Sequence, residues 1–154
     1  MKKIIQFFKK IIQFFKNEQY KNPPPKPIEL PHYTVTIFDK EIVELINKYR
    51  QENTLSKLTI NEMLCSVAAS HSIYMAEKEK ASHDCATDRQ NIFLPKLLAE
   101  IVGYGYKMPQ SYFSAWTGSY SHNKKMLDPD HIEIGIAAYP SETGVKYVTV
   151  LFLS

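Results

Sequence analysis

The stretch that decides the fold reads AWTGSYSHNKKML and covers residues 115–127. Within it Trp116, Ser119 and His122 follow one another at intervals of three residues, and an apolar Met-Leu pair closes the stretch. A large aromatic side chain of this kind is usually buried, whereas the hydroxyl and the imidazole are polar. We therefore expect Trp116 to pack in the core beside a small group of polar side chains.

Two further stretches precede it, Ser82-His83 after a long helical pattern and Ala99-Glu100-Ile101 further along the chain. Taken in this order, the three stretches resemble the signature of bacterial-type CAP domains (the cysteine-rich secretory protein, antigen 5 and pathogenesis-related 1 superfamily). Three ordered matches are more specific than any one of them. The resemblance covers residues 39–154 and implies an α+β fold, an α-β-α sandwich with a central antiparallel sheet.

The resemblance also implies a polar cleft. In CAP domains two histidines and two glutamates converge on one concave surface. Matched motif by motif, these positions fall on His83, Glu100 and His122, and the second glutamate falls on Ser119. Because only one of the two carboxylates is present, the roles of general acid and general base cannot be divided between two glutamates. The resemblance therefore predicts a cleft that lacks one of the family's candidate catalytic groups.

Two imidazoles with a carboxylate are a credible ligand set for Zn²⁺ that leaves a position open for water or substrate. His83 and His122 are therefore the predicted metal ligands. An imidazole near an uncovered helix N-terminus tends to stay neutral, and neutral imidazole is the form that binds metal. The same side chains could equally form a hydrogen-bonded brace between two helix ends. A nucleophile made of Ser119 or Ser121 with His122 has no oxyanion-hole motif to support it.

The charge is unevenly distributed along the 154 residues, whose formal net charge is +3. Residues 1–16 carry five lysines and no acidic residue, which leaves a net charge of −2 on the other 138 residues. The globular part is therefore not predicted to bind nucleic acid. An apolar content of 44% with 12% aromatic residues is sufficient for a packed core.

Residues 2–15 contain the heptapeptide KKIIQFF twice in succession. At about 100° per residue the apolar side chains share one half of a helix and the lysines the other, which predicts a basic amphipathic helix over 1–16. Such a helix binds an anionic membrane surface or a protein groove, and it is too polar to span a bilayer. It is also a poor cleavable signal peptide, because lysines interrupt its apolar run. The predicted contact residues are Ile4, Phe7, Phe8, Ile11, Phe14 and Phe15.

A proline-rich linker follows over 17–32, with the sequence NPPPKP at its centre. Proline fixes φ and removes the amide donor, so this segment is predicted to form an extended spacer. The predicted organisation is therefore a helix over 1–16, a linker over 17–32 and a CAP-like domain over 33–154.

The CAP-like domain is predicted to contain five helices and two strands. The predicted helices are one capped by Asp39, one from a capping box at Thr59–Glu62 to Lys80, a short one from Pro95 through Glu100, one opened by Pro109, and a short one from His122 to Leu127 capped by Ser121. The predicted strands cover 132–139 and 146–153.

Three functions are compatible with these patterns. The first is a non-catalytic CAP-type binding module, with an unidentified ligand, that the N-terminal helix tethers to a membrane surface or a larger assembly. The second is a metal- or histidine-dependent hydrolase of peptide or cell-wall material, and the third is a structural adaptor that docks through residues 1–16. The missing second glutamate disfavours the hydrolase, so the binding module is the prediction, at a membrane or in the extracellular envelope. The composition, rich in Lys, Ile, Asn and Tyr, suggests a bacterial or phage source.

Overall fold

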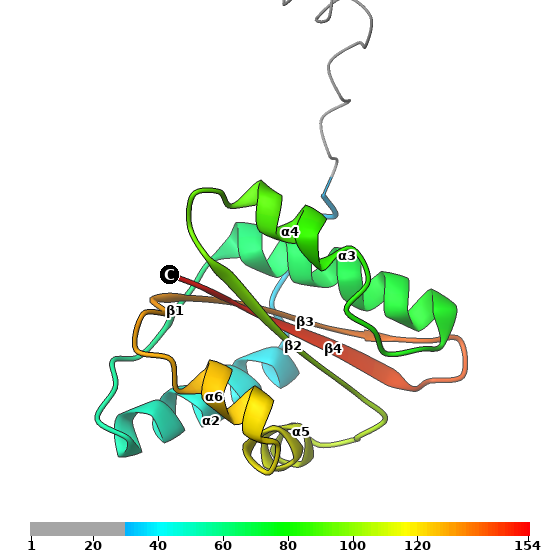
Figure 1. The fold of residues 1–154 in the computed structure, drawn as a ribbon. Coiled ribbons are helices and arrows are strands. Elements are labelled where there is room, and N and C mark those ends of the chain that lie inside the picture. The colour runs from blue at the N-terminus through cyan, green and yellow to red at the C-terminus, as the bar shows by residue number, and fades with distance from the viewer. Residues whose placement is uncertain (1–29) are drawn as a thin grey trace, which may run out of the picture.

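The computed structural model describes residues 30–154 (Figure 1). The predicted helix over 1–16 and residues 17–29 of the predicted linker lie outside the described residues. Between residues 30 and 154 the chain forms five helices and one four-stranded sheet. The predicted α+β sandwich is therefore confirmed.

The bounds of the elements follow the chain from α2 to β4. The helices are α2 (Ile37–Glu52), α3 (Glu62–Lys78), α4 (Ala86–Ile92), α5 (Pro109–Thr117) and α6 (Tyr120–Met126), and the strands are β1 (Thr59–Ile60), β2 (Leu98–Tyr104), β3 (Glu133–Pro140) and β4 (Lys146–Leu153). The strands are ordered β1-β3-β4-β2 in the sheet, and all pairs are antiparallel except β1 with β3. The predicted terminal hairpin is confirmed to within one residue.

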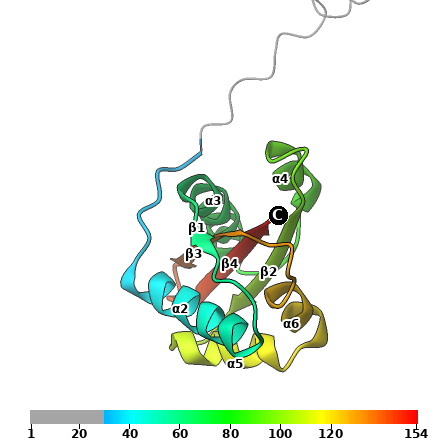
Figure 2. The ribbon, with the colours of Figure 1, turned by 90° about the vertical axis from the view of Figure 1, so that its left-hand side faces the viewer.

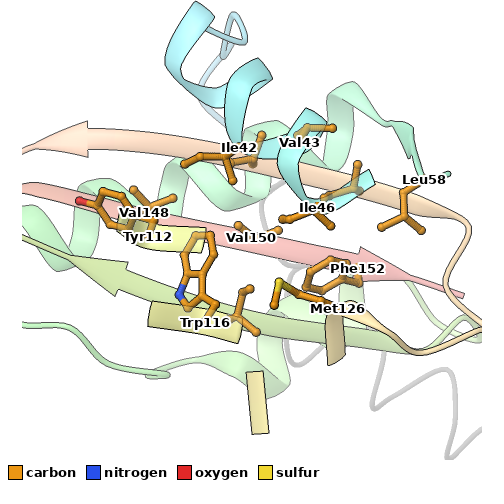
Figure 3. Packing of buried hydrophobic residues seen from close by; sticks show 13 residues of the cluster. Ile42, Val43, Ile46, Leu58, Tyr112, Trp116, Met126, Val148, Val150 and Phe152 are labelled. Carbon is orange, nitrogen blue, oxygen red and sulfur yellow. The ribbon is translucent and has the colours of Figure 1, made fainter. Parts of the chain in front are cut away.

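Helices cover both faces of the sheet. Figures 1 and 2 show α3 and α4 on one face and α2, α5 and α6 on the other. On the second face, aromatic and branched side chains from α2, α5 and β4 form the largest apolar cluster (Figure 3). Trp116 is only 2% exposed there, and its indole nitrogen donates a hydrogen bond of 2.9 Å to the carbonyl of Val102. The expectation that Trp116 belongs to the core is thus correct.

The α3 face is packed more closely, with small side chains against β3. A Cβ atom at Gly135 would lie only 2.3 Å from the Cβ of Leu64, a distance at which one of the two backbones must move. Glycine at this position therefore lets the helix lie directly on the strand.

The first turn of α2 differs from the prediction. Thr36 is the N-cap, and a capping box joins its hydroxyl to the amide of Asp39 at 3.2 Å and the Asp39 carboxylate to the amide of Thr36 at 2.9 Å. Asp39 therefore occupies the third helical position and not the cap that we predicted. The Tyr33 hydroxyl donates to the Asp39 carboxylate at 2.7 Å and accepts from the amide of Ala138 at 3.2 Å. Tyr33 thus joins the entering chain to α2 and to β3.

Helix α3 also begins later than predicted. Asn61 is its N-cap and accepts a hydrogen bond of 3.0 Å from the amide of Leu64. Thr59, predicted to open a capping box, instead lies in the short strand β1, which pairs with β3. The sheet edge satisfies the backbone groups of this segment, so a helical turn has no advantage there. The helix ends at Lys78, two residues before the predicted end.

The prediction of a short helix from Pro95 through Glu100 is wrong. Leu98 to Tyr104 form β2, which pairs along its whole length with β4 and places Glu100 opposite Leu151. Pairing with β4 provides partners for the backbone groups of both strands, and this long-range gain overrides the local helical signals. A helix does form just upstream, as α4, where the sequence pattern is ambiguous.

Arg50 is fully buried near the end of α2 and holds a loop junction together. Its guanidinium donates to the carbonyls of Ser56 at 2.9 Å, Met126 at 2.8 Å, Asp128 at 2.8 Å and His131 at 3.2 Å. All four acceptors are backbone oxygens, and burial lowers the pKa of this arginine. The network fixes the end of α6 relative to α2.

The two cysteines are free and lie in different surroundings. Cys65 is buried in α3, and Cys85 is exposed just before α4. Burial raises the pKa of the Cys65 thiol, which is consistent with a small apolar core residue.

Within residues 30–154, every helix is too short or too polar to cross a membrane.

Candidate functional site

Glu100 on β2 is the centre of the candidate site. It is 8% exposed, and its carboxylate accepts hydrogen bonds from Arg89 Nε at 2.6 Å and Arg89 Nη2 at 2.9 Å. The same carboxylate lies 2.8 Å from His83 Nδ1. A bidentate arginine pair is the strongest arrangement for a buried carboxylate. Two partners from the segment between α3 and β2 therefore hold the Glu100 carboxylate in place.

His83 lies in the loop between α3 and α4, with half of its side chain exposed. Because Nδ1 faces a carboxylate, that nitrogen carries the hydrogen and donates it. Nε2, on the opposite edge of the ring, is left available to a ligand. The structure thus brings the predicted residues His83 and Glu100 into direct contact.

His122 and Lys125 lie one turn apart on α6, and Lys125 reaches the site. The Lys125 ammonium donates a hydrogen bond of 2.8 Å to the backbone carbonyl of Glu100. His122 Nδ1 is buried without a hydrogen-bond partner among the described residues. Burial lowers the pKa of His122, and the positive charges of Lys125 and His83 lower it further. No hydrogen bond joins His122 to His83 or Glu100 among the described residues, so its place in the same site stays a prediction.

Ser119 occupies the N-cap position of α6 but does not cap it with its side chain. In the described part of the chain, its hydroxyl has one side-chain partner, the Ser121 hydroxyl at 3.3 Å. The prediction that Ser121 caps this helix is wrong, since α6 already begins at Tyr120. Ser119 therefore joins neither His83 nor Glu100 through a hydrogen bond.

Two residues of the site were missed from the sequence, Arg89 and Lys125. One signal could have identified the first: the chain contains only two arginines among its 19 basic residues, and both are buried. In a lysine-rich sequence, arginine is expected where a planar, multiply hydrogen-bonded cation is needed. No comparable signal distinguishes Lys125 from its neighbour Lys124.

Behind Glu100 the site is closed by His71 of α3. This imidazole is 3% exposed, donates from Nε2 to the carbonyl of Ser82 at 2.8 Å and lies 3.8 Å from the Glu100 carboxylate. Burial and the charge of Arg89 lower the pKa of His71. It is a hydrogen-bonded core histidine, as its place on an apolar helical stripe indicates.

The open side of the site is a hollow of about 330 Å³. Apolar side chains form one part of its wall and polar groups the other, and it is lined by His83, Ala86, Leu98, Ala99, Glu100 and Lys125. We call this hollow the β2 cleft. It is small, has apolar and charged walls, and contains the freely exposed edge of His83.

The donors of the β2 cleft fit a zinc ion poorly. Both oxygens of Glu100 are already engaged by Arg89 and His83, so this carboxylate is not free to coordinate a metal. Among residues 30–154, no group of three or more His, Cys, Asp or Glu side chains is placed to hold a metal ion. His83 and His122 supply two imidazoles at most, and the ammonium of Lys125 lies beside them. Zinc at these histidines therefore stays a prediction that the surrounding charges oppose.

Comparison with known families identifies the class of protein. Residues 43–152 match the cysteine-rich secretory protein family, CAP, which is most of the chain. The protein therefore belongs to the CAP family. Among curated proteins it is similar to the uncharacterized protein YkwD of Bacillus subtilis (strain 168), with 32% identity over 110 residues. That match covers 67% of this chain and 43% of YkwD, so the chain spans less than half of that relative.

Solved structures show the same fold. An outer surface protein from Borrelia burgdorferi superposes with a TM-score of 0.72 at 21% identity, over 81% of this chain and 98% of that one. An extracellular protein containing an SCP domain from Bacillus anthracis str. Ames gives a TM-score of 0.65 at 24% identity, over 74% of this chain and 39% of that one. At these identities the likeness establishes the fold alone.

Proposed function

We propose that this chain is a non-catalytic CAP-type binding module, held at a membrane surface by its basic N-terminal segment. The observation that supports the absence of catalysis is that both oxygens of the Glu100 carboxylate already have hydrogen-bond partners. Arg89 and His83 together occupy both of its oxygens at 2.6 to 2.9 Å. A general base needs a lone pair that can reach the substrate or a water molecule. Glu100 is instead a brace between β2 and the loop before α4.

The remaining polar groups do not restore a catalytic pair. The resemblance aligns Ser119 with the second carboxylate, and its hydroxyl contacts only the hydroxyl of Ser121 among described side chains. His122 has a buried, unpartnered Nδ1 and no carboxylate among the described residues that would orient it. An imidazole acting as a general base is normally oriented by such a partner. These contacts support ligand binding without turnover.

The proposed attachment to a membrane surface rests on the sequence of residues 1–16 and on the similar proteins. Residues 1–16 repeat a basic, amphipathic heptapeptide with five lysines and no acid. Two structural relatives are named an outer surface protein and an extracellular protein, which supports a location in the cell envelope. A helix of this composition gains free energy from apolar insertion and from attraction to anionic lipids.

A turnover assay tests the absence of catalysis. The full-length chain is incubated with casein and with purified peptidoglycan, with and without added Zn²⁺, beside the His83→Ala variant. We expect both proteins to give the same background rate. Hydrolysis by the wild type that disappears in His83→Ala would overturn the proposal in favour of the hydrolase.

Sedimentation with lipid vesicles tests the tether. The full-length chain should bind vesicles rich in phosphatidylglycerol, release as salt rises from about 50 to about 500 mM, and ignore purely zwitterionic vesicles. The double variant Phe7→Glu/Phe14→Glu should stay in the supernatant. The matched control is Ile37→Glu, which changes an exposed apolar side chain of the folded domain and should bind like the wild type. Equal binding by both variants would exclude membrane tethering through residues 1–16.

A further inference from the structure

We infer that the β2 cleft accepts a small organic anion, a short-chain carboxylate, in preference to a divalent cation. The inference rests on the proposed binding function and names the class of ligand for that site. It follows from the positions of Lys125 and Arg89, from the open edge of His83 and from the apolar part of the cleft wall.

The charge of the cleft is set by which cations have an anionic partner. Arg89 forms a bidentate ion pair with Glu100, so the negative charge of that carboxylate is already balanced. Lys125 donates to the backbone carbonyl of Glu100, which is a neutral acceptor. No acidic side chain within residues 30–154 forms an ion pair with Lys125. The ammonium that lines the cleft therefore contributes a positive charge without a counter-ion in the described part of the chain.

The hydrogen-bonding groups of the cleft are suited to an oxyanion. An ammonium carries three donors, and Lys125 uses one of them on the Glu100 carbonyl. The other two remain for a ligand that enters the cleft. His83 presents Nε2 on the open side while Nδ1 is held by Glu100. A carboxylate that accepts from the free donors of the Lys125 ammonium makes a charge-assisted hydrogen bond.

The charge of Lys125 at the cleft also bears on which ligand it accepts. A positive end of the cleft is favourable for an anion and unfavourable for a divalent cation. A metal ion would also have to displace Arg89 or His83 from Glu100 to gain a carboxylate ligand.

The apolar wall limits the ligand further. Ala86, Leu98 and Ala99 line the same hollow of about 330 Å³ as Lys125 and His83. A bare inorganic anion would leave these side chains without contacts, whereas a short alkyl tail would cover them and remove apolar surface from water. The cleft is therefore complementary to a molecule with one charged end and one apolar end.

Titrations of the full-length chain with butanoate, inorganic phosphate and Zn²⁺, followed by backbone amide chemical shifts, test the inference. Butanoate should shift the amides of Ala86, Leu98 and Ala99 and saturate in the millimolar range, more tightly than phosphate. Lys125→Met should weaken butanoate binding by about tenfold or more, while Lys125→Arg keeps the charge and should retain binding. The matched control is Lys124→Met, an exposed lysine on the same helix, which should bind like the wild type.

Three results would overturn the inference. One is the absence of saturable shifts with either anion, and another is equal weakening by Lys124→Met and Lys125→Met. The third is micromolar Zn²⁺ binding by the wild type that is lost in His83→Ala. Phosphate binding as tight as butanoate would exclude the contribution of the apolar wall. Failure of the proposed function is detected separately, because hydrolysis in the turnover assay does not depend on these titrations.

Discussion

The two arginines of this chain are both buried, yet their surroundings differ. Arg50 donates hydrogen bonds to four backbone carbonyls, one in the segment after α2 and three between the end of α6 and β3. Arg89 ends mainly on the carboxylate of Glu100, which is shared with the half-exposed His83. The first network is closed within the fold. The second continues through Glu100 and His83 to the surface of the β2 cleft.

This difference shows that a buried arginine can stabilise the fold at one position and support a functional site at another. An arginine bound only to backbone oxygens fixes loops and leaves no group for a ligand. An arginine bound to a carboxylate balances its charge and orients whatever else that carboxylate holds. Four expected outcomes test the contrast, in order of decreasing size.

The largest effect is expected at Arg50. Replacing it with methionine leaves four backbone carbonyls without their donor, two of them in buried hydrogen bonds, and the free energy of unfolding should fall by about 3–5 kcal/mol. Urea unfolding at neutral pH measures the loss. The control Lys48→Met changes an exposed residue of the same helix and should stay within about 0.5 kcal/mol of the wild type. A loss below about 1 kcal/mol in Arg50→Met would contradict the closed network.

At Arg89 the expected loss is about 2–4 kcal/mol, because Arg89→Met leaves Glu100 buried and unpaired. Unlike the loss at Arg50, this loss can be relieved by one further substitution. The double variant Arg89→Met/Glu100→Gln should be more stable than the sum of the single losses predicts, by about 1–3 kcal/mol in a double-mutant cycle. Strict additivity would mean that the two side chains are not energetically coupled.

Each network has a buried histidine beside it, His131 near Arg50 and His71 near Arg89, and burial lowers the pKa of both. Their folded-state pKa values thus lie below the unfolded value of about 6.5. As the pH falls through that value, the unfolded chain takes up protons first and stability decreases. Stability should therefore decrease from about pH 7.5 to about pH 5.5, with a slope of at most about 1.4 kcal/mol per pH unit for each such histidine.

Thermal or urea unfolding across that pH range measures the slope. His131→Phe keeps a flat ring against Phe152, with which His131 stacks at a centroid distance of 5.4 Å, and should reduce the slope. His71→Phe should reduce it as well. A wild-type stability that rises on acidification, or slopes unchanged in both variants, would refute the assignment of lowered pKa values to these two residues.

The smallest effect is expected at His83, the outer member of the Arg89 network. His83→Ala removes one hydrogen bond to Glu100 from a side chain that is half exposed, while Arg89 still holds the carboxylate. The free energy of unfolding should fall by only about 0.5–1 kcal/mol. Calorimetric or urea unfolding of the variant checks this value. A loss as large as that of Arg89→Met would place His83 in the structural network and not at the edge of a ligand site.

The family was predicted from the resemblance of three ordered stretches to known motifs. The terminal hairpin and the helix opened by Pro109 were predicted from the sequence because they depend on local residue patterns and turn chemistry. Prediction from the sequence failed at β2, where helix signals around Pro95 were overridden by pairing with β4. Strand pairing between residues so far apart cannot be read from a local window.

The candidate site shows the same limit. His83 and Glu100 were predicted from motifs, and the structure places them 2.8 Å apart. Arg89 and Lys125 were missed, because their contacts with Glu100 span 11 and 25 residues of sequence. Local motifs therefore identified which groups could act, whereas the tertiary contacts decided that the Glu100 carboxylate is paired and that the Lys125 ammonium has no acidic partner among the described residues.

The attachment of Tyr33 has a mechanical consequence. In the proposed tethered arrangement, a pulling force would reach the described part of the chain at Leu30, and Tyr33 is the first side chain there that has hydrogen bonds to two elements. Its hydroxyl divides the tension between Asp39 in the capped first turn of α2 and Ala138 within β3. Under that proposal, a force on the chain would load a strand inside the sheet together with the helix, and α2 would resist being unwound from its end.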